Sequence, residues 1–326
     1  MMYLGIDVAK AKLDCMLLNP DSGKHYSKVV SNDTKGFAAL LMWLRSRHVE
    51  PGQVHVVMEA TGVYHESAAL CFSDAGLRVS VINPAQMRHY AQGLAVYTKT
   101  DKVDSLVIAR YGAMVQPPAW QAPAPNVRQL KALVARLQAL QADEQRELNR
   151  REKTRVACEG ELVEQSLQRH LTYIGQEIQR VQQAIGEHID KDPDLKTDYK
   201  LLVSIPAVGD KTAIHMLSIM HSHHFDSAEQ LAAFLGLYPV QQESGSSVHK
   251  RSRMAKNGNG KIRAVLYMAS LSATRCNAQT QALYTRLCAK AKPKMVALGA
   301  VMRKLVHQCF GVIKHQTPYR ADWNAA

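Results

Sequence analysis

A run of prolines divides this chain more firmly than any other feature of its sequence. Residues Pro117–Pro125 hold four prolines in nine positions. Proline neither continues a helix interior nor fits a central strand, because its ring fixes φ and removes the backbone donor. We therefore predict a stiff, extended linker over 117–125 and a domain boundary there. The chain has 326 residues, which is enough for two or three globular units.

Before the linker, strand-like and helix-like segments alternate. Three short strand patterns come first, and Asn32–Asp33–Thr34 then provides a capping sequence for the first helix. The predicted order is strands 3–9, 12–18 and 24–30, a helix from 34, strand 54–60, helix 65–75, strand 78–83, and helices 84–94 and 101–114. This is the ribonuclease H-like order of a mixed sheet flanked by helices. We predict that residues 1–116 form such an α/β domain.

After the linker, residues 126–193 are predicted to form two long amphipathic helices. Apolar residues recur every three or four positions, with charged residues between them and a break near Gly160. This stripe fits an antiparallel hairpin within one chain or a coiled coil between subunits, and the sequence leaves both open. The stripe consists of Leu130, Leu133, Leu137 and Leu140, then Leu167, Leu171, Ile174, Ile178, Val181 and Ile185.

Residues 194–326 are predicted to form a third, mainly helical domain. Its first segment, KLLVSIPAVGDKTAIHML, is similar to a helix-hairpin-helix, whose tight turn presents backbone N–H groups to a phosphate. Ala207 stands where that motif often has a glycine. The alternative is an ordinary corner between two packed helices.

Positive charge is concentrated in this last part of the chain. The net charge is +13, and residues 244–320, called here the acid-free block, contain fifteen Lys and Arg but no Asp or Glu. Such a block attracts polyanions through counterion release and phosphate contacts, so nucleic acid is the predicted partner. A merely solvated lysine face is the alternative, although such faces usually intersperse acids.

Several classes of protein are disfavoured. Asp7 and Lys10 interrupt any signal-length apolar run at the N-terminus, and we expect no membrane span. The six cysteines are scattered without a C-x-x-C pair, so we expect buried free thiols, no disulfides and no zinc in a cytoplasmic protein. His221–His224 lacks a Cys or acid partner at ligand spacing, and we interpret it as a polar loop.

Four carboxylates stand out by their positions. Asp7 lies in the first predicted strand, and Glu59 ends a central one. Asp101 and Asp104 lie three apart, on one face of a helix. An acid in an apolar strand is costly unless a cation compensates it, and clustered carboxylates bind Mg²⁺, which supports phosphoryl transfer. The alternative is that these acids simply face solvent.

A second group of residues opens the acid-free block. Ser244, Ser246 and Ser247 lie among glycines and cations. A serine hydroxyl close to cations or a metal can attack phosphorus and form a phosphoserine ester. A flexible Ser/Gly loop is the plainer interpretation of the local composition. The neighbouring cations predicted to bind nucleic acid are Lys250, Arg251, Arg253, Lys256 and Arg263.

These motifs together resemble a known family. GIDVAK, MEATGVY, VINPAQ and TKTDKVDSLVIA, followed by SIPAVGDKTA, FLGLYPVQQESGSS and MAKNGNGKIRAVLYMA, resemble the DEDD-type insertion-sequence transposases. That family comprises bridge-RNA-guided DNA recombinases, and the Piv-like DNA invertases are similar to it. The resemblance spans nearly the whole chain, with the motifs in the same order.

The resemblance implies a fold and a site. It implies a first domain similar to RuvC-type Holliday junction resolvases, a coiled-coil insert, and a C-terminal transposase domain with a catalytic serine. Motif matching assigns the metal-binding acids to Asp7, Glu59, Asp101 and Asp104, and the serine to Ser244, with Ser246 or Ser247 as possible offsets. Lys256, Gly258 and Arg263 match the basic segment after the serine.

The resemblance also implies partners. It implies a structured non-coding RNA that pairs with donor and target DNA, so that the protein recognises backbone and shape. It further implies dimers that join into a tetramer, and nucleoid association when DNA is bound.

Three functions therefore compete. The first is an RNA-guided recombinase with Mg²⁺ on the four acids and Ser244 as nucleophile. The second is a metal-dependent, RuvC-like junction endonuclease in which water attacks. The third is a non-enzymatic nucleic-acid scaffold, which the complete set of catalytic residue types disfavours.

Overall fold

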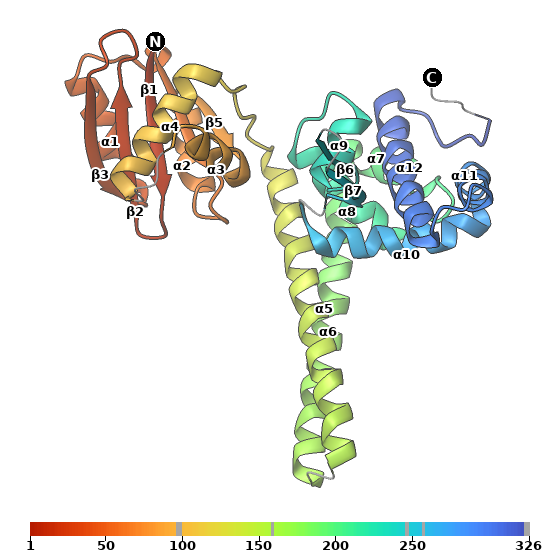
Figure 1. Cartoon of the computed structure of the whole chain (residues 1–326). Helices are drawn as coiled ribbons and strands as arrows, with labels where there is room; N and C mark the ends of the chain where they lie inside the picture. The colour runs from red at the N-terminus through yellow and green to blue at the C-terminus, as the bar shows by residue number, and fades with distance from the viewer. Residues whose placement is uncertain (96–99, 158–159, 245–247, 256–257, 323–326) are drawn as a thin grey trace. The chain divides into compact units, whose positions relative to one another are not determined.

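The protein is described by a computed structural model that covers residues 1–95, 100–157, 160–244, 248–255 and 258–322. The chain divides into two compact units, Met1–Ala122 and Pro123–Ala326, and the division falls inside the proline-rich run (Figure 1). Each unit is considered by itself below.

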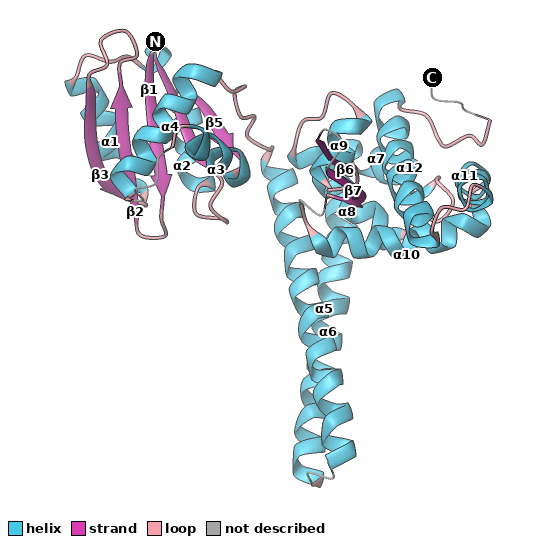
Figure 2. Ribbon diagram, viewed as in Figure 1, coloured by secondary structure: helices cyan, strands magenta, loops and turns pink. Residues whose placement is uncertain are grey.

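Unit 1 is a five-stranded mixed sheet with helices on both faces, drawn in magenta and cyan in Figure 2. The strand order is β3-β2-β1-β4-β5. The pairs β1–β2 and β2–β3 are antiparallel, whereas β1–β4 and β4–β5 are parallel. The elements are β1 (Met2–Val8), β2 (Lys12–Leu18), β3 (His25–Ser31), α1 (Thr34–Ser46), a 3-10 turn (Pro51–Gln53), β4 (Val54–Glu59), α2 (Glu66–Asp74), β5 (Arg78–Ile82), α3 (Pro84–Gly93) and α4 (Asp101–Val115). This confirms the predicted ribonuclease H-like order.

Side-chain alternation assigns each strand residue to one face of the sheet. Leu4, Ile6 and Val8 of β1 share one buried cluster with residues of α1 and α2. Val57 of β4 belongs to a different cluster, with residues of α3 and α4. Odd-numbered residues of β1 and β4 therefore lie on the face that α4 covers. Asp7 and Glu59 are two of them.

Helix α4 packs directly against β1 because Gly5 has no side chain. A Cβ built on Gly5 would lie 2.1 Å from the Ser105 carbonyl oxygen and 2.4 Å from the Ala109 backbone nitrogen. No side chain fits at such distances, so glycine at this position allows the close approach. The start of α4 is thereby fixed over the carboxyl end of β1.

The first part of the proline-rich run belongs to unit 1. The Trp120 backbone N–H donates to the Val79 carbonyl at 2.7 Å. The Ser80 hydroxyl donates to the Pro118 carbonyl at 2.6 Å and lies 2.8 Å from His55 Nε2. The run is therefore fixed along β5, and helix α5 already begins at its last proline, Pro125.

Unit 2 consists of helices and one short hairpin of strands. Its elements are α5 (Pro125–Ala157), α6 (Glu161–Lys191), α7 (Pro193–Val203), α8 (Asp210–Ser222), α9 (Ala228–Phe234), β6 (Pro239–Ser244), β7 (Val248–Met254), α10 (Gly260–Cys276), α11 (Ala278–Ala289) and α12 (Lys294–His315). Helices α5 and α6 form an antiparallel hairpin within the chain, which is one of the two arrangements that the sequence left open (Figure 1). Asp192 caps α7 through its carboxylate, which accepts from Asp194 and Leu195 backbone N–H groups.

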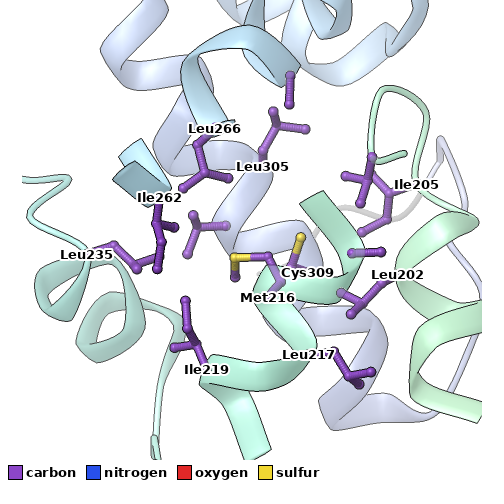
Figure 3. Packing of buried hydrophobic residues seen from close by; sticks show 14 of the residues in the cluster. Leu202, Ile205, Met216, Leu217, Ile219, Leu235, Ile262, Leu266, Leu305 and Cys309 are labelled. Atoms are coloured by element: carbon purple, nitrogen blue, oxygen red, sulfur yellow. The ribbon is translucent and has the colours of Figure 1, made fainter. Parts of the chain in front are cut away.

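One apolar core runs through unit 2. Figure 3 shows Leu202 and Ile205 next to Met216 and Leu217 of α8, with Leu305 and Cys309 of α12 nearby. Leu130 of α5 and Ile185 of α6 belong to the same cluster and are fully buried. The base of the hairpin therefore shares its core with the C-terminal helices. For that reason residues 126–193 are not separate from residues 194–326 in this structure.

One expectation needs correction. His221 belongs to helix α8 rather than a loop. Its Nε2 lies 2.8 Å from the carboxylate of the buried residue Asp198, which is 23 residues away in sequence and therefore could not be recognised as a partner from local spacing.

Helix α12 is long and apolar enough to cross a membrane by length and composition alone. Half of that apolar window is buried inside the unit, and the core helix of a globular unit meets the same criteria of length and composition.

The described cysteines are free, but they are not uniformly buried. Cys15 and Cys309 are buried, whereas Cys276 is exposed and Cys71 and Cys288 are intermediate. Cys158 lies outside the described residues. Burial was therefore predicted too broadly for these thiols.

Candidate active site

Two of the predicted acids lie side by side at the ends of neighbouring parallel strands. Ile6 of β1 is paired with Met58 of β4, so the residues that follow them, Asp7 and Glu59, lie next to each other. Both point to the α4 face by strand alternation. The carboxyl end of the central strands is where sheets of this class gather functional groups.

The other two acids come from the first turn of α4. Thr100 caps this helix, and its hydroxyl accepts from the Val103 backbone N–H at 3.3 Å. Asp101 and Asp104 both lie in that first turn. The close packing of α4 at Gly5 brings the turn near Asp7.

The electrostatics of Asp7 reflect this convergence. Burial, and then the charges of Asp104, Asp101, Asp14 and Glu59, raise the pKa of Asp7 from 3.8 to about 6. Like charges and desolvation both disfavour an ionised carboxyl group. The structure thus brings all four sequence-predicted acids into one electrostatic neighbourhood.

A fifth carboxylate, which the sequence analysis missed, completes this neighbourhood. Asp14 of β2 is paired directly with Asp7 across the antiparallel β1–β2 ladder. It is 8% exposed. The signal was present in the sequence, because a short turn joins two strand patterns and fixes which residues oppose each other.

Lys12 is a second missed residue. Its Nζ lies 2.6 Å from Asp101 Oδ2 and 3.0 Å from Asp14 Oδ2. Lys12 and Asp14 are two apart on β2 and therefore share the α4 face. The ammonium group links the strand acid to the helix acid and neutralises part of the cluster.

The donor set has the chemistry that a hard divalent cation requires. It offers several carboxylate oxygens, and burial together with the neighbouring acids raises the pKa of Asp7, which a bound cation would offset. As the side chains stand, no three His, Cys, Asp or Glu residues in the described parts of the chain are placed to hold one ion. Lys12 Nζ lies 2.6 Å from Asp101 Oδ2.

The predicted serine lies in unit 2, at the end of strand β6. Ser244 is paired with Val248 of β7, so the segment that sequence composition favoured as a loop begins as a β-hairpin. Only the backbone of Ser244 is described. Ser246 and Ser247, the alternative nucleophiles, lie outside the described residues.

The predicted nucleic-acid-binding cations fall into three groups. Arg253 of β7 is exposed, as binding requires. Arg263 is partly used by the fold, because its Nη1 donates to the carbonyls of Gly258 at 3.0 Å and Leu235 at 3.3 Å. The side chains of Lys250 and Arg251 in β7, and all of Lys256, lie outside the described residues.

Known proteins are similar to this chain along nearly its whole length. The DEDD-type IS110 transposase model matches residues 4–154, and the model described as "Transposase IS116/IS110/IS902 family" matches residues 199–285. The pilin gene-inverting proteins of Moraxella lacunata and Moraxella bovis are each 31% identical over 323 residues, which is 97% of this chain and 97% of theirs. The chain belongs to the IS110 transposase family. As a member, it is an enzyme that cleaves and rejoins DNA.

Solved structures are also similar to part of this IS110-family transposase. The structure of T. thermophilus RuvC in complex with a Holliday junction substrate matches with a TM-score of 0.28 and 17% sequence identity. The match covers 37% of this chain and all of the RuvC chain. The ribonuclease H-like assignment rests on the strand order and pairing described above.

Proposed function

We propose that this transposase is an RNA-guided recombinase of an insertion sequence, which exchanges DNA strands through a phosphoserine intermediate at Ser244. The observation that carries the proposal is the convergence of Asp104, Asp101 and Glu59 on the half-buried Asp7. A family that cleaves DNA needs a site where negative charge on phosphorus is stabilised. This cluster, in the N-terminal unit, is the candidate.

Asp7, Glu59, Asp101 and Asp104 would hold Mg²⁺. A bound Mg²⁺ would supply Lewis-acid stabilisation of phosphoryl oxygens. The protein's own contribution is position: β1 and β4 fix two carboxylates on the sheet, and the capped first turn of α4 fixes the other two. Lys12 would hold Asp101 until the cation arrives.

The serine step conserves the phosphodiester energy. The Ser244 oxygen loses its proton and forms a bond to phosphorus, while the bond from phosphorus to one sugar oxygen breaks and that oxygen takes up a proton. The reverse reaction, with a new sugar hydroxyl as attacking group, rejoins DNA without another energy source. Water attack would instead leave free ends.

The acid-free block is proposed to bind the nucleic acids, which comprise donor DNA, target DNA and a guide RNA. Within it, Lys290, Lys292 and Lys294 are exposed around the turn between α11 and α12. Contacts of this type recognise phosphates rather than bases. Sequence choice would then be left to base pairing with the RNA.

Assembly is proposed to use the α5–α6 hairpin. Its end farthest from the unit 2 core carries exposed apolar residues, with Val156 82% exposed and Leu162 76% exposed. Exposed apolar groups on a helical hairpin favour packing against another copy. Dimers formed this way would join into a tetramer, in the cytoplasm and on the nucleoid when DNA is bound.

Reconstitution tests this proposal. The full-length protein would be combined with Mg²⁺, RNA transcribed from the DNA that flanks its gene, and two DNA duplexes. We expect joined products only when the RNA and both duplexes are present. Products that form equally well without RNA would contradict RNA guidance, and cleavage of four-way junctions to unjoined ends would support the junction endonuclease instead.

A further inference from the structure

A groove in unit 2 combines cations, open space and unused hydrogen-bonding groups. Helices α5, α8 and α10 line it, and its volume is about 610 Å³, which is within the range of about 300–1,000 Å³ typical of ligand pockets. All three helices belong to the same compact unit. The groove is separate from the acid cluster, which lies in unit 1.

Two lysines stand at the groove in the first turns of their helices. Lys211 lies in the first turn of α8 and Lys261 in that of α10. Both are exposed, and neither has an ion-pair partner among the described residues. Among the residues that the structure describes, no Asp or Glu lines the groove. The neighbouring acid, Asp210, accepts a hydrogen bond from the Tyr199 hydroxyl at 2.8 Å. The charge of the groove is therefore positive.

Polar side chains of largely buried residues line the wall of the groove. Thr212 is 6% exposed, and its hydroxyl has no hydrogen-bond partner within the described chain. His215 is 4% exposed, and there only its Nδ1 has a partner, Gln138 Nε2 at 3.4 Å. Burial lowers the pKa of His215 to about 4, so the imidazole is neutral near pH 7. Polar side chains that line a pocket fix the orientation of a polar ligand, so Thr212 and His215 make this wall suitable for one.

The turn before α8 also favours an anionic ligand in the groove. Ala207 has φ of 77°, a left-handed conformation, and occupies the position where a helix-hairpin-helix often has glycine. The cap residue of α8 is Gly209, which offers no side-chain acceptor to the first backbone N–H groups. These groups are unsatisfied at every helix start and favour anions. The turn itself lines the groove through Ala207.

We propose that this groove between α5, α8 and α10 binds the phosphodiester backbone of a DNA strand, with Lys211 and Lys261 flanking the phosphates and Thr212 donating to one of them. A DNA strand is the occupant because the family acts on DNA and because the groove continues the acid-free block, to which Lys261 belongs. The inference rests on the proposed function in taking DNA as its ligand.

Affinity and its salt dependence test this proposal. Binding of the full-length protein to a labelled DNA duplex would be measured over a range of salt concentrations. Lys211→Gln and Lys261→Gln should each lower the slope of log affinity against log salt by about 0.9 and weaken binding roughly fivefold near physiological salt. Lys200→Gln is the matched control, because Lys200 is an exposed lysine of α7 that does not line the groove.

A second pair of variants avoids removing a lysine. Ala264→Glu places a carboxylate in the groove from the exposed surface of α10, whereas Ala139→Glu places one on an exposed position of α5 outside the groove. Ala264→Glu should weaken binding more than tenfold, and Ala139→Glu much less. Thermal melting would verify that all variants fold.

The outcomes separate this inference from the proposed function. Wild-type binding and slope in Lys211→Gln, Lys261→Gln and Ala264→Glu would overturn the groove assignment, even if the enzyme still recombines DNA. The groove assignment would also be overturned if these variants lost affinity for RNA but not for DNA, or if they changed oligomeric state without losing DNA affinity. A wild-type protein that binds no nucleic acid would instead refute the proposed function.

Discussion

Lys12 Nζ lies 2.6 Å from Asp101 Oδ2, and this contact joins the sheet of unit 1 to helix α4, which supplies Asp101 and Asp104. The same ammonium lies 3.0 Å from Asp14. Hydrogen bonds to Asp101 and Asp14 raise the pKa of Lys12, so it remains charged at every physiological pH. Lys12 thus acts as a tethered cation at the edge of a candidate metal site.

Replacing Lys12 with methionine should make the protein more dependent on a divalent cation. Without the ammonium, repulsion among the carboxylates is less compensated, so the metal-free protein should melt at a lower temperature and gain more from added Mg²⁺ than the wild type does. Lys28→Met, on the exposed strand β3, is the control. Equal Mg²⁺-induced shifts in Tm for wild type and Lys12→Met would contradict the role assigned to Lys12.

Asp7 should make the stability of the metal-free protein pH-dependent. Its pKa is raised from 3.8 to about 6 by burial and neighbouring carboxylates. Between these values the folded state holds a proton that the unfolded state releases, so the contribution of Asp7 to the free energy of unfolding falls as pH rises from about 4 to about 6. Urea unfolding in EDTA should show this fall in the wild type relative to Asp7→Asn. If the difference in the free energy of unfolding between the wild type and Asp7→Asn does not change with pH, the raised pKa of Asp7 is refuted.

Gly5→Ala should damage the site without altering any acid. A Cβ at this position would lie 2.1 Å from a backbone oxygen of α4, so the helix must move away from β1. We expect a loss of about 3 kcal/mol in the free energy of unfolding and a large loss of DNA cleavage. Gly93→Ala is the control, because nothing lies within 4 Å of its Cβ. Full cleavage activity in a folded Gly5→Ala protein would show that the placement of α4 is not critical.

Single substitutions of the acids should separate cleavage from binding. Asp7→Ala, Glu59→Ala and Asp104→Ala should abolish cleavage and leave DNA affinity nearly unchanged, because they remove metal ligands and not the basic surface. Asp101→Ala should be milder, since Lys12 shares that side chain. Asp21→Ala, in the exposed turn after β2, should cleave normally. Wild-type cleavage by Asp7→Ala would remove the site assignment.

The sequence predicted the features of this structure that depend on local signals, and it missed those that depend on contacts between distant residues. Strands and helices of unit 1 were predictable because strand alternation, the Asp33 cap and the proline-rich run are local signals. Asp7 and Glu59 could be singled out because Asp7 lies within an apolar strand pattern and Glu59 lies at the end of another. Asp14 and Lys12 were missed because their importance depends on the β1–β2 register, which pairs Asp14 with Asp7.

The features missed in unit 2 also depend on tertiary contacts. The β6–β7 hairpin has a polar, serine-rich sequence without apolar alternation, so its strands resembled a loop. The His221 side chain contacts Asp198 because helices α7 and α8 pack against each other. The shared core of the α5–α6 hairpin and the C-terminal helices likewise joins residues far apart in sequence, such as Leu130 and Leu305.

The most direct test of the central claim is to trap the cleavage reaction in denaturant and look for DNA covalently attached to the protein. Serine attack predicts an adduct in the wild type, in Ser246→Ala and in Ser247→Ala, and none in Ser244→Ala or Asp7→Ala. If the adduct is lost only in Ser246→Ala or Ser247→Ala, serine attack still holds, but the nucleophile is that serine and not Ser244. Cleavage to free ends at the wild-type rate by Ser244→Ala would contradict the account and establish water as the nucleophile.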